Sequence, residues 1–82
     1  MFSKELFGQR LRALRKQNKE TQDTLAAVLG LKKAQVSEME NGNSSTTPEK
    51  LTLICEHYKV SADYLLGLTD DPAPRPSDGD QV

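Results

Sequence analysis

The stretch LGLKKAQVSEMENG, residues 29–42, contains the side chains whose types and spacing most suggest chemistry. Two lysines, Lys32 and Lys33, stand at its front, and two glutamates, Glu38 and Glu40, stand near its end. Lysine ammonium groups donate hydrogen bonds to phosphates and other acceptors, whereas carboxylates only accept them. The stretch therefore fits two alternatives: a helix that contacts a polyanion, or a solvated helix of mixed charge.

A helical wheel divides this stretch into two faces. With Val36 at the centre of the inner face, Met39 and Glu40 fall to either side of it. The outward face carries short side chains, most of them polar: Ala34, Gln35, Ser37, Glu38 and Asn41. Solvated helices more often present Glu/Lys pairs four residues apart, whereas short hydrogen-bonding side chains let a helix approach another surface closely. The outward face therefore favours contact with a partner.

Five short helices are predicted to position this stretch. Capping residues and glycines mark their limits: Ser3 to about Gln17, Thr21 to Gly30, Leu31–Asn41 ended by Gly42, Thr47 with Pro48 to about Tyr58, and Ser61 to Gly67. Apolar residues recur at helical spacing, as at Phe7, Leu11 and Leu14, and no alternating run predicts a strand. We expect an all-α fold, a compact bundle of five helices around one core.

The charge is unevenly distributed along the 82 residues, a length that suits one small domain. Residues 1–33 carry a net charge of +5, residues 34–68 carry −3, and the last fourteen carry −3, for a total of −1. A basic patch compatible with a polyanionic partner therefore lies in the N-terminal third of the chain.

Composition also predicts the domain limits and excludes several classes of function. The folded domain should span residues 1–69, and the Pro- and Asp-rich residues 70–82 should form a disordered tail. One cysteine, Cys55, cannot form an intrachain disulfide, and it and the lone His57 suggest neither a catalytic set nor a metal site. We expect a cytoplasmic protein without a membrane segment, enzymatic activity or cofactor.

Several motifs together resemble a known family. The run LRALRKQNKETQDTLAAVLGLKKAQVSEMENG, followed by PEKLTLICEHYKVSADYLLGL, is similar to the phage repressor and Cro type of helix-turn-helix domain, the Xre family. The shared features are TQ-x-x-LA, the turn glycine, E-x-G and VS-x-DYLLGL, and the likeness as a whole covers roughly residues 4–69. The resemblance implies a lambda-repressor-like fold, with the helix-turn-helix formed by the second and third helices, and binding to double-stranded DNA.

The resemblance also implies roles for particular residues. Gln22 and Asn41 match positions that contact the DNA backbone, while Lys33, Ala34 and Glu38 match positions that meet base edges, with Lys32, Gln35 and Ser37 as neighbours. Lys33 could donate to guanine, Ala34 could pack on a thymine methyl group, and Glu38 could accept from cytosine N4. Lys32 stands where the family usually has a Ser or Thr cap, so a phosphate contact would replace capping there.

A buried ion pair is the second implication of the resemblance. Glu40 and Arg15 lie at the edges of the inner faces of their helices, where a lone charge would be costly to bury. The family pattern implies that they pair inside the domain and fix the third helix against the first.

These features together predict a bacterial or phage transcriptional regulator, most simply a repressor that binds a palindromic operator as a homodimer with the third helix in the major groove. Tyr64, Leu65 and Leu68 are candidates for the dimer surface. The alternatives are a restriction-modification controller, an antitoxin, or a protein-interaction module with little DNA affinity. A protein partner such as a toxin or antirepressor stays open.

Overall fold

Side-chain caps determine where four of the five helices begin. The computed structural model describes residues 1–74, which form α1 (Lys4–Gln17), α2 (Gln22–Leu29), α3 (Lys33–Glu40), α4 (Pro48–Tyr58) and α5 (Ala62–Leu66). The hydroxyl oxygens of Ser3, Thr21, Thr47 and Ser61 each accept a hydrogen bond from the backbone N–H three residues later. The predicted all-α fold with five helices is therefore confirmed.

The predicted start of the third helix was wrong by two residues. Leu31 and Lys32 belong to the turn and not to α3, and Asn41 is the residue that follows its last helical residue. Gly30 adopts a left-handed conformation with φ of 67°, and the N–H of Leu31 bonds back to the carbonyl of Ala26 at 2.9 Å. Leu31 packs against the core from this turn, so its apolar side chain extended the helical pattern without extending the helix.

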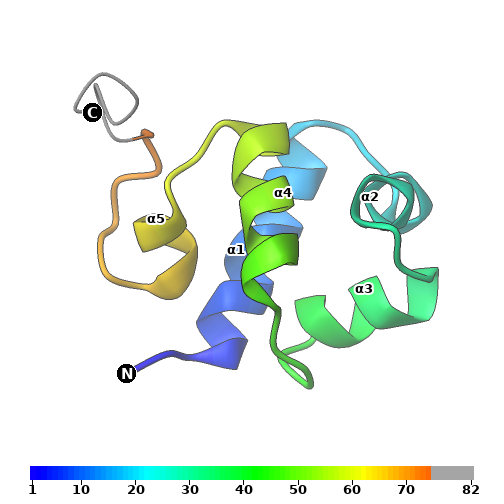
Figure 1. Cartoon of the computed structure of the whole chain (residues 1–82), viewed down its shortest axis with the longest axis horizontal. Coiled ribbons are helices and arrows are strands. Elements are labelled where there is room, and N and C mark those ends of the chain that lie inside the picture. Colours follow the sequence, from blue (N-terminus) through cyan, green and yellow to red (C-terminus); the bar gives the residue numbers. More distant parts are fainter. Residues whose placement is uncertain (75–82) are drawn as a thin grey trace.

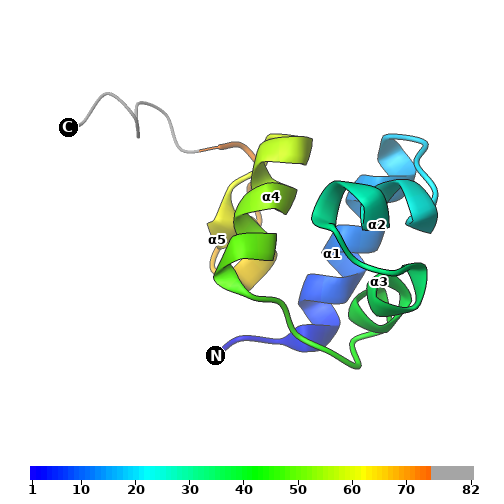
Figure 2. The ribbon, with the colours of Figure 1, turned by 45° about the vertical axis from the view of Figure 1, so that its right-hand side comes forward.

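The helices are arranged around α1. Figure 1 shows α1 passing behind α4, with α2 and α3 on one side of it and α5 on the other. In the turned view of Figure 2, α4 and α5 lie on the left and α2 and α3 on the right. Contacts between helices join α1 to α3 and α5, α2 to α3 and α4, and α4 to α5. The buried core takes side chains from all five: Phe7, Leu11, Leu14, Leu25, Ala26, Leu29, Val36, Met39, Ile54 and Leu65, together with Val60. None of the helices in residues 1–74 has the length and apolar character needed to span a membrane.

A glycine allows α1 and α3 to pack at very short range. A Cβ atom placed on Gly8 would lie 2.3 Å from the carbonyl oxygen of Met39 and 2.7 Å from that of Glu40. These are backbone atoms of α3, which cannot rotate away as a side chain could. Gly8 therefore sets the distance at which the two helices meet.

Leu65 does not belong to a surface for dimerisation, contrary to the prediction. Its side chain is fully buried in the core, whereas Leu68 is 70% exposed. Tyr64 is half-buried, and the guanidinium carbon of Arg10 lies 4.1 Å from the centre of its ring. The helix α5 is only five residues long, so the side that faces α1 and α4 takes Leu65 and leaves Leu68, beyond the helix, in solvent.

The segment after α5 returns along the helices. Arg10 donates to the carbonyl oxygen of Thr69 at 2.7 Å and to the carboxylate of Asp70 at 2.8 Å. The N–H of Ser61 donates to the carbonyl of Pro72 at 3.1 Å. The first residues of the predicted tail therefore contact the domain, and residues 75–82 lie outside the described part of the chain.

Candidate nucleic-acid interface

The third helix turns one face to the core and the other to solvent. Val36, Met39 and Glu40 are buried, as the helical wheel places them. Among the residues predicted to contact DNA, six are exposed: Lys32, Lys33, Ala34, Gln35, Glu38 and Asn41. Ser37 and Gln22 are half-buried. The structure thus gathers the predicted residues around the exposed face of α3 and the start of α2.

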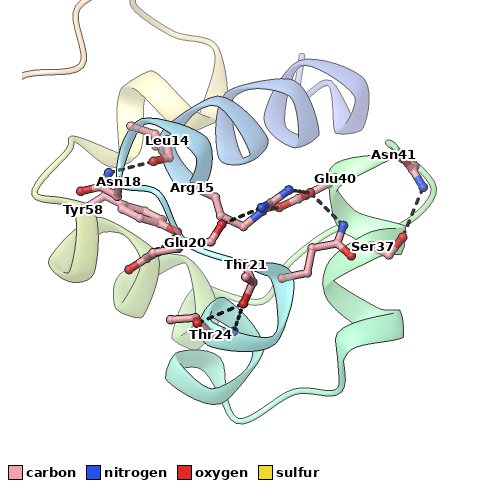
Figure 3. A network of polar contacts seen from close by, with 11 residues as sticks. Leu14, Arg15, Asn18, Glu20, Thr21, Thr24, Ser37, Glu40, Asn41 and Tyr58 are labelled. Atoms are coloured by element: carbon pink, nitrogen blue, oxygen red, sulfur yellow. Dashed lines mark hydrogen bonds and ion pairs between the residues drawn. The ribbon is translucent and has the colours of Figure 1, made fainter.

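A buried ion pair attaches α3 to α1. Arg15 Nε donates to Glu40 Oε2 at 2.6 Å, and Arg15 Nη2 donates to Glu40 Oε1 at 3.0 Å (Figure 3). The Glu40 side chain is 1% exposed and that of Arg15 is 11% exposed. The hydrogen bonds with Glu40 raise the pKa of the Arg15 guanidinium and outweigh the opposing effect of burial. The expected pair is present, and its bidentate geometry fixes the angle between the two helices.

Gln22 joins this pair from the first turn of α2. Its Nε2 donates to Glu40 Oε1 at 3.1 Å, so one carboxylate oxygen accepts from both Arg15 and Gln22. The remaining guanidinium nitrogen, Arg15 Nη1, donates to the backbone carbonyl of Glu20 at 2.8 Å. Residues of α1, α2 and α3 are therefore held together at one point, and the buried Glu40 carboxylate orients the Gln22 side chain.

Glu20 extends the network to α4. Its two carboxylate oxygens contact the Tyr58 hydroxyl and His57 Nε2, each at 2.7 Å (Figure 3 shows the former). Burial alone would raise the pKa of the Glu20 carboxyl, but these hydrogen bonds, with the charges of His57 and Arg15, hold it below its ordinary value. His57 therefore has a carboxylate partner that the sequence did not predict. Its partner lies 37 positions away, beyond the reach of any local pattern.

The front end of α3 lacks a side-chain cap. Lys32 has the extended backbone of a capping residue, with φ of −89° and ψ of 154°, but lysine has no atom that can accept a hydrogen bond. Gln35 compensates in part, because its Oε1 accepts from the N–H of Lys32 at 2.8 Å. Two ammonium groups, those of Lys32 and Lys33, are consequently presented at the end of α3 that carries the partial positive charge of the helix.

The back end of α3 presents Asn41. Its Nδ2 lies 3.5 Å from the Ser37 hydroxyl oxygen, a long hydrogen bond that leaves the amide accessible (Figure 3). The chain then turns at Gly42, where φ is 79°, and a Cβ there would come within 3.1 Å of Cα of Glu5. Asn41 is therefore held close to α1 as well as at the exposed face.

A groove that sequence did not predict runs beside the exposed face of α3. It has a volume of about 380 Å³ and lies between α3, the loop that follows it and the start of α4. Its lining combines Leu31, Gln35, Glu38 and Met39 with the hydroxyl residues Ser44–Thr47 and Lys50. Lys50 and Glu38 line the same groove because of how α4 packs against α2, which no local sequence pattern indicates.

Cys55, in α4, is not among the residues that line this groove. Cys55 is half-buried against the core, and burial, with a smaller effect of Glu56, raises the pKa of its thiol. Within residues 1–74, no three His, Cys, Asp or Glu side chains cluster as metal ligands.

Residues 11–65 match the HTH_3 family model, described as helix-turn-helix, which covers more than half of the chain. The chain belongs to the HTH_3 family. This family comprises transcription regulators of the Xre and Cro/C1 type, so the resemblance seen in the sequence is confirmed.

Relatives and solved structures of HTH_3 type agree with this assignment. The chain is 41% identical over 70 residues to the uncharacterized HTH-type transcriptional regulator YobD of Bacillus subtilis (strain 168), a match over 85% of this chain and 62% of that protein. It is 32% identical over 62 residues to the antitoxin PezA of Streptococcus pneumoniae, a match over 76% of this chain and 39% of that one. The chain thus spans about three fifths and two fifths of these relatives.

The fold of this HTH_3 domain is also found in solved structures. The P22 c2 repressor in complex with a synthetic operator superposes with a TM-score of 0.71 at 33% identity, covering 74% of this chain and 92% of that one. The restriction-modification controller protein C.AhdI of Aeromonas hydrophila superposes with a TM-score of 0.68 at 29% identity, covering 76% and 94%. The lambda-repressor-like architecture predicted from sequence is therefore confirmed.

Proposed function

We propose that the protein binds double-stranded DNA sequence-specifically as a homodimeric transcriptional repressor, with α3 in the major groove of each half of a palindromic operator. The observation that carries the proposal is the exposed face of α3, which is short and polar and is fixed against α1 by the buried Arg15–Glu40 pair. A major groove about 12 Å wide admits one helix, and a helix that enters it must be held rigidly to distinguish bases.

Two kinds of contact follow from the positions of the side chains. Lys33, Ala34 and Glu38 project from the exposed face of α3, where they would read base edges. Gln22 at the start of α2 and Asn41 at the end of α3 flank that face, where they would bind phosphates of the backbone and set the register. Lys32, Gln35 and Ser37 would support these contacts from neighbouring positions.

The test is a selection of bound duplexes from a random pool, followed by a salt titration on the selected site. A DNA-binding protein loses affinity with a log–log slope of several units as salt rises. Lys33→Ala and Glu38→Ala should change which bases are preferred, whereas Gln22→Ala should weaken binding on all sequences alike. Equal losses on every sequence for all three variants would show that α3 does not read bases, and no slope on any duplex would reject DNA binding.

A second function is supported by one comparison. The similarity to the antitoxin PezA suggests that a domain of this type could also act with a protein partner. In that case the DNA-binding face would be unchanged, and a toxin would copurify with the chain when both are expressed from their native locus. The similarity to C.AhdI supports a restriction-modification controller by the same reasoning.

A further inference from the structure

The groove beside α3 contains a positive charge, that of Lys50, which has no partner among residues 1–74. Lys50 is half-buried and lines the groove together with Gln35 and Glu38. Its backbone N–H donates a hydrogen bond to the Thr47 hydroxyl at 3.2 Å. Its ammonium group, however, forms no hydrogen bond or ion pair with any of residues 1–74, the part of the chain that the structure describes. A half-buried lysine without a carboxylate partner has an ammonium group available to an external acceptor.

The ammonium group of Lys50 lies beside the turn that connects α2 and α3. Lys50 Nζ lies 3.9 Å from the point where a Cβ would stand on Gly30, the glycine that ends α2. The side chain therefore runs from α4 across to the turn that leads into α3. Lys50 thus places a cation from α4 in the groove beside α3, which the hydroxyl residues Ser44–Thr47 also line.

The charge balance of the region explains why a cation matters there. Residues 34–68 carry only two basic residues, Lys50 and Lys59, against five acidic ones. Glu38 lies on the face proposed to meet DNA, where phosphates would repel its carboxylate. Lys50 lines the same groove as Glu38, so it adds a positive charge from α4 to those of Lys32 and Lys33 at the start of α3.

We propose that Lys50 is a DNA-contacting residue, whose ammonium binds a backbone phosphate beside α3 and offsets the repulsion between Glu38 and the phosphates. The ligand is thus a phosphodiester of the operator strand that runs along the groove, with the hydroxyls of the 44–47 loop as further donors. This inference rests on the proposed DNA binding, and it adds a fourth-helix contact to those of α2 and α3.

The experiment compares Lys50→Met with Lys59→Met on the duplex selected by the wild-type protein. Both variants remove one positive charge from α4 or its end, but Lys59 lies nine residues further along, roughly 13 Å away at 1.5 Å per residue. Methionine keeps an unbranched stem in the groove while removing the ammonium. Each phosphate contact contributes about 0.9 to the log–log salt slope, so the advantage of wild type over Lys50→Met should shrink about threefold to fourfold between 50 and 200 mM salt.

The selected base sequence separates this role from that of Glu38. A pool selection with Lys50→Met should return the wild-type site, because a phosphate contact carries no sequence information, and Lys59→Met should leave slope and site unchanged. A wild-type slope in Lys50→Met, with thermal stability intact, would show that the lysine only covers the groove and would overturn the proposal. An altered site would overturn it too, by making Lys50 a base contact. Absence of a salt slope in the wild-type protein would instead reject DNA binding itself.

Discussion

At the scale of single residues, the functional face depends on charges that are not part of it. Glu40 accepts hydrogen bonds from Arg15 and Gln22, so the side chain proposed to bind phosphate is oriented by a buried carboxylate. The hydrogen bonds of these three residues link α1, α2 and α3. Substitutions in the buried pair should therefore affect stability first and DNA binding as a consequence.

Removing one partner of the buried pair should be more harmful than removing both. Arg15→Met leaves the Glu40 carboxylate buried without its cation, and breaking such a pair costs about 3–5 kcal/mol of unfolding free energy. The double variant Arg15→Met/Glu40→Met replaces both charges by apolar groups and should recover most of that loss. Urea denaturation of the two proteins measures the difference. Unchanged midpoints for Arg15→Met and for Glu40→Gln would show that the pair contributes nothing.

The Glu20 carboxylate should make stability depend on acid pH. Its pKa in the folded protein is lowered below the ordinary value of 4.5, so its stabilising contribution is present above that value and is lost as pH falls through the lower folded-state pKa. The advantage in melting temperature of wild type over Glu20→Gln should therefore be constant near neutral pH and shrink below about pH 4.5. Thermal unfolding followed by circular dichroism at pH 3–7 tests this. An advantage that grows on acidification would contradict the assigned direction.

At the scale of secondary-structure elements, two local features determine how α3 is placed: its uncapped start and its close contact with α1. At its front, Lys32 takes a capping position that it cannot satisfy, and at its back, the helix packs against Gly8 of α1 at backbone contact distance. Lys32 places a positive charge at the start of α3, and the contact with Gly8 determines how far α3 projects from the domain.

Replacing the uncapped lysine should raise stability and lower DNA affinity. Lys32→Ser introduces an oxygen at a backbone conformation that already suits a cap, which should stabilise the fold by about 0.5–1 kcal/mol. The same change removes an ammonium from the proposed interface, so duplex binding at low salt should weaken and the salt slope should fall by about 0.9. A melting curve and a salt titration on one sample measure both effects. If they change in the same direction, Lys32 does not have these two opposed roles.

Gly8→Ala should destabilise the protein although alanine is the better helix former. Helix propensity favours the alanine by about 1 kcal/mol, but its Cβ would meet two carbonyl oxygens of α3 at impossible distances. Overpacking costs about 1–3 kcal/mol or more, and a clash with two backbone oxygens belongs at the upper end of that range, so the net effect should be a loss of about 2 kcal/mol or more. Gln9→Ala, at an exposed position of the same helix, is the control. A stabilised Gly8→Ala would mean that α1 and α3 can separate freely.

At the scale of the whole molecule, one domain offers too small an interface for a long operator, and a second copy is the proposed solution. Leu68 is 70% exposed, and the half-buried Tyr64, whose backbone carbonyl accepts a hydrogen bond from Arg10, lies four residues before it in the sequence. With Leu65 assigned to the core, Leu68 and Tyr64 remain the candidates for the surface between two copies.

Leu68→Ser should weaken self-association without unfolding the domain. Burying a leucine at an interface contributes about 1.5–3 kcal/mol, so the dimer dissociation constant should rise roughly tenfold or more. Sedimentation equilibrium measures that constant, and Leu53→Ser, at an exposed leucine of α4, serves as the control. Binding to a duplex with two half-sites should weaken accordingly, while binding to a single half-site should not. Equal effects of the two variants would remove Leu68 from the proposed interface.

The sequence by itself determined the helices and the family. Hydroxyl caps and glycines act through hydrogen bonds within four or five residues, so Ser3, Thr21, Thr47 and Ser61 marked helix starts correctly. The division of α3 into a buried and an exposed face followed from a period of 3.6 residues, which is also a local property. The error at Leu31 arose because an apolar residue in a turn has the same pattern as one in a helix.

Only the tertiary structure decided which distant side chains meet. His57 and Tyr58 of α4 contact Glu20, which lies 37 and 38 positions earlier in the sequence. Gly8 meets the backbone of α3 at Met39, 31 positions away, and Lys50 reaches the turn at Gly30, 20 positions away. These contacts depend on the angles and distances at which whole helices pack, which many buried side chains determine together. The same packing buries Leu65 on the side of α5 that faces the core, whereas Leu68 lies beyond the end of this five-residue helix and is exposed.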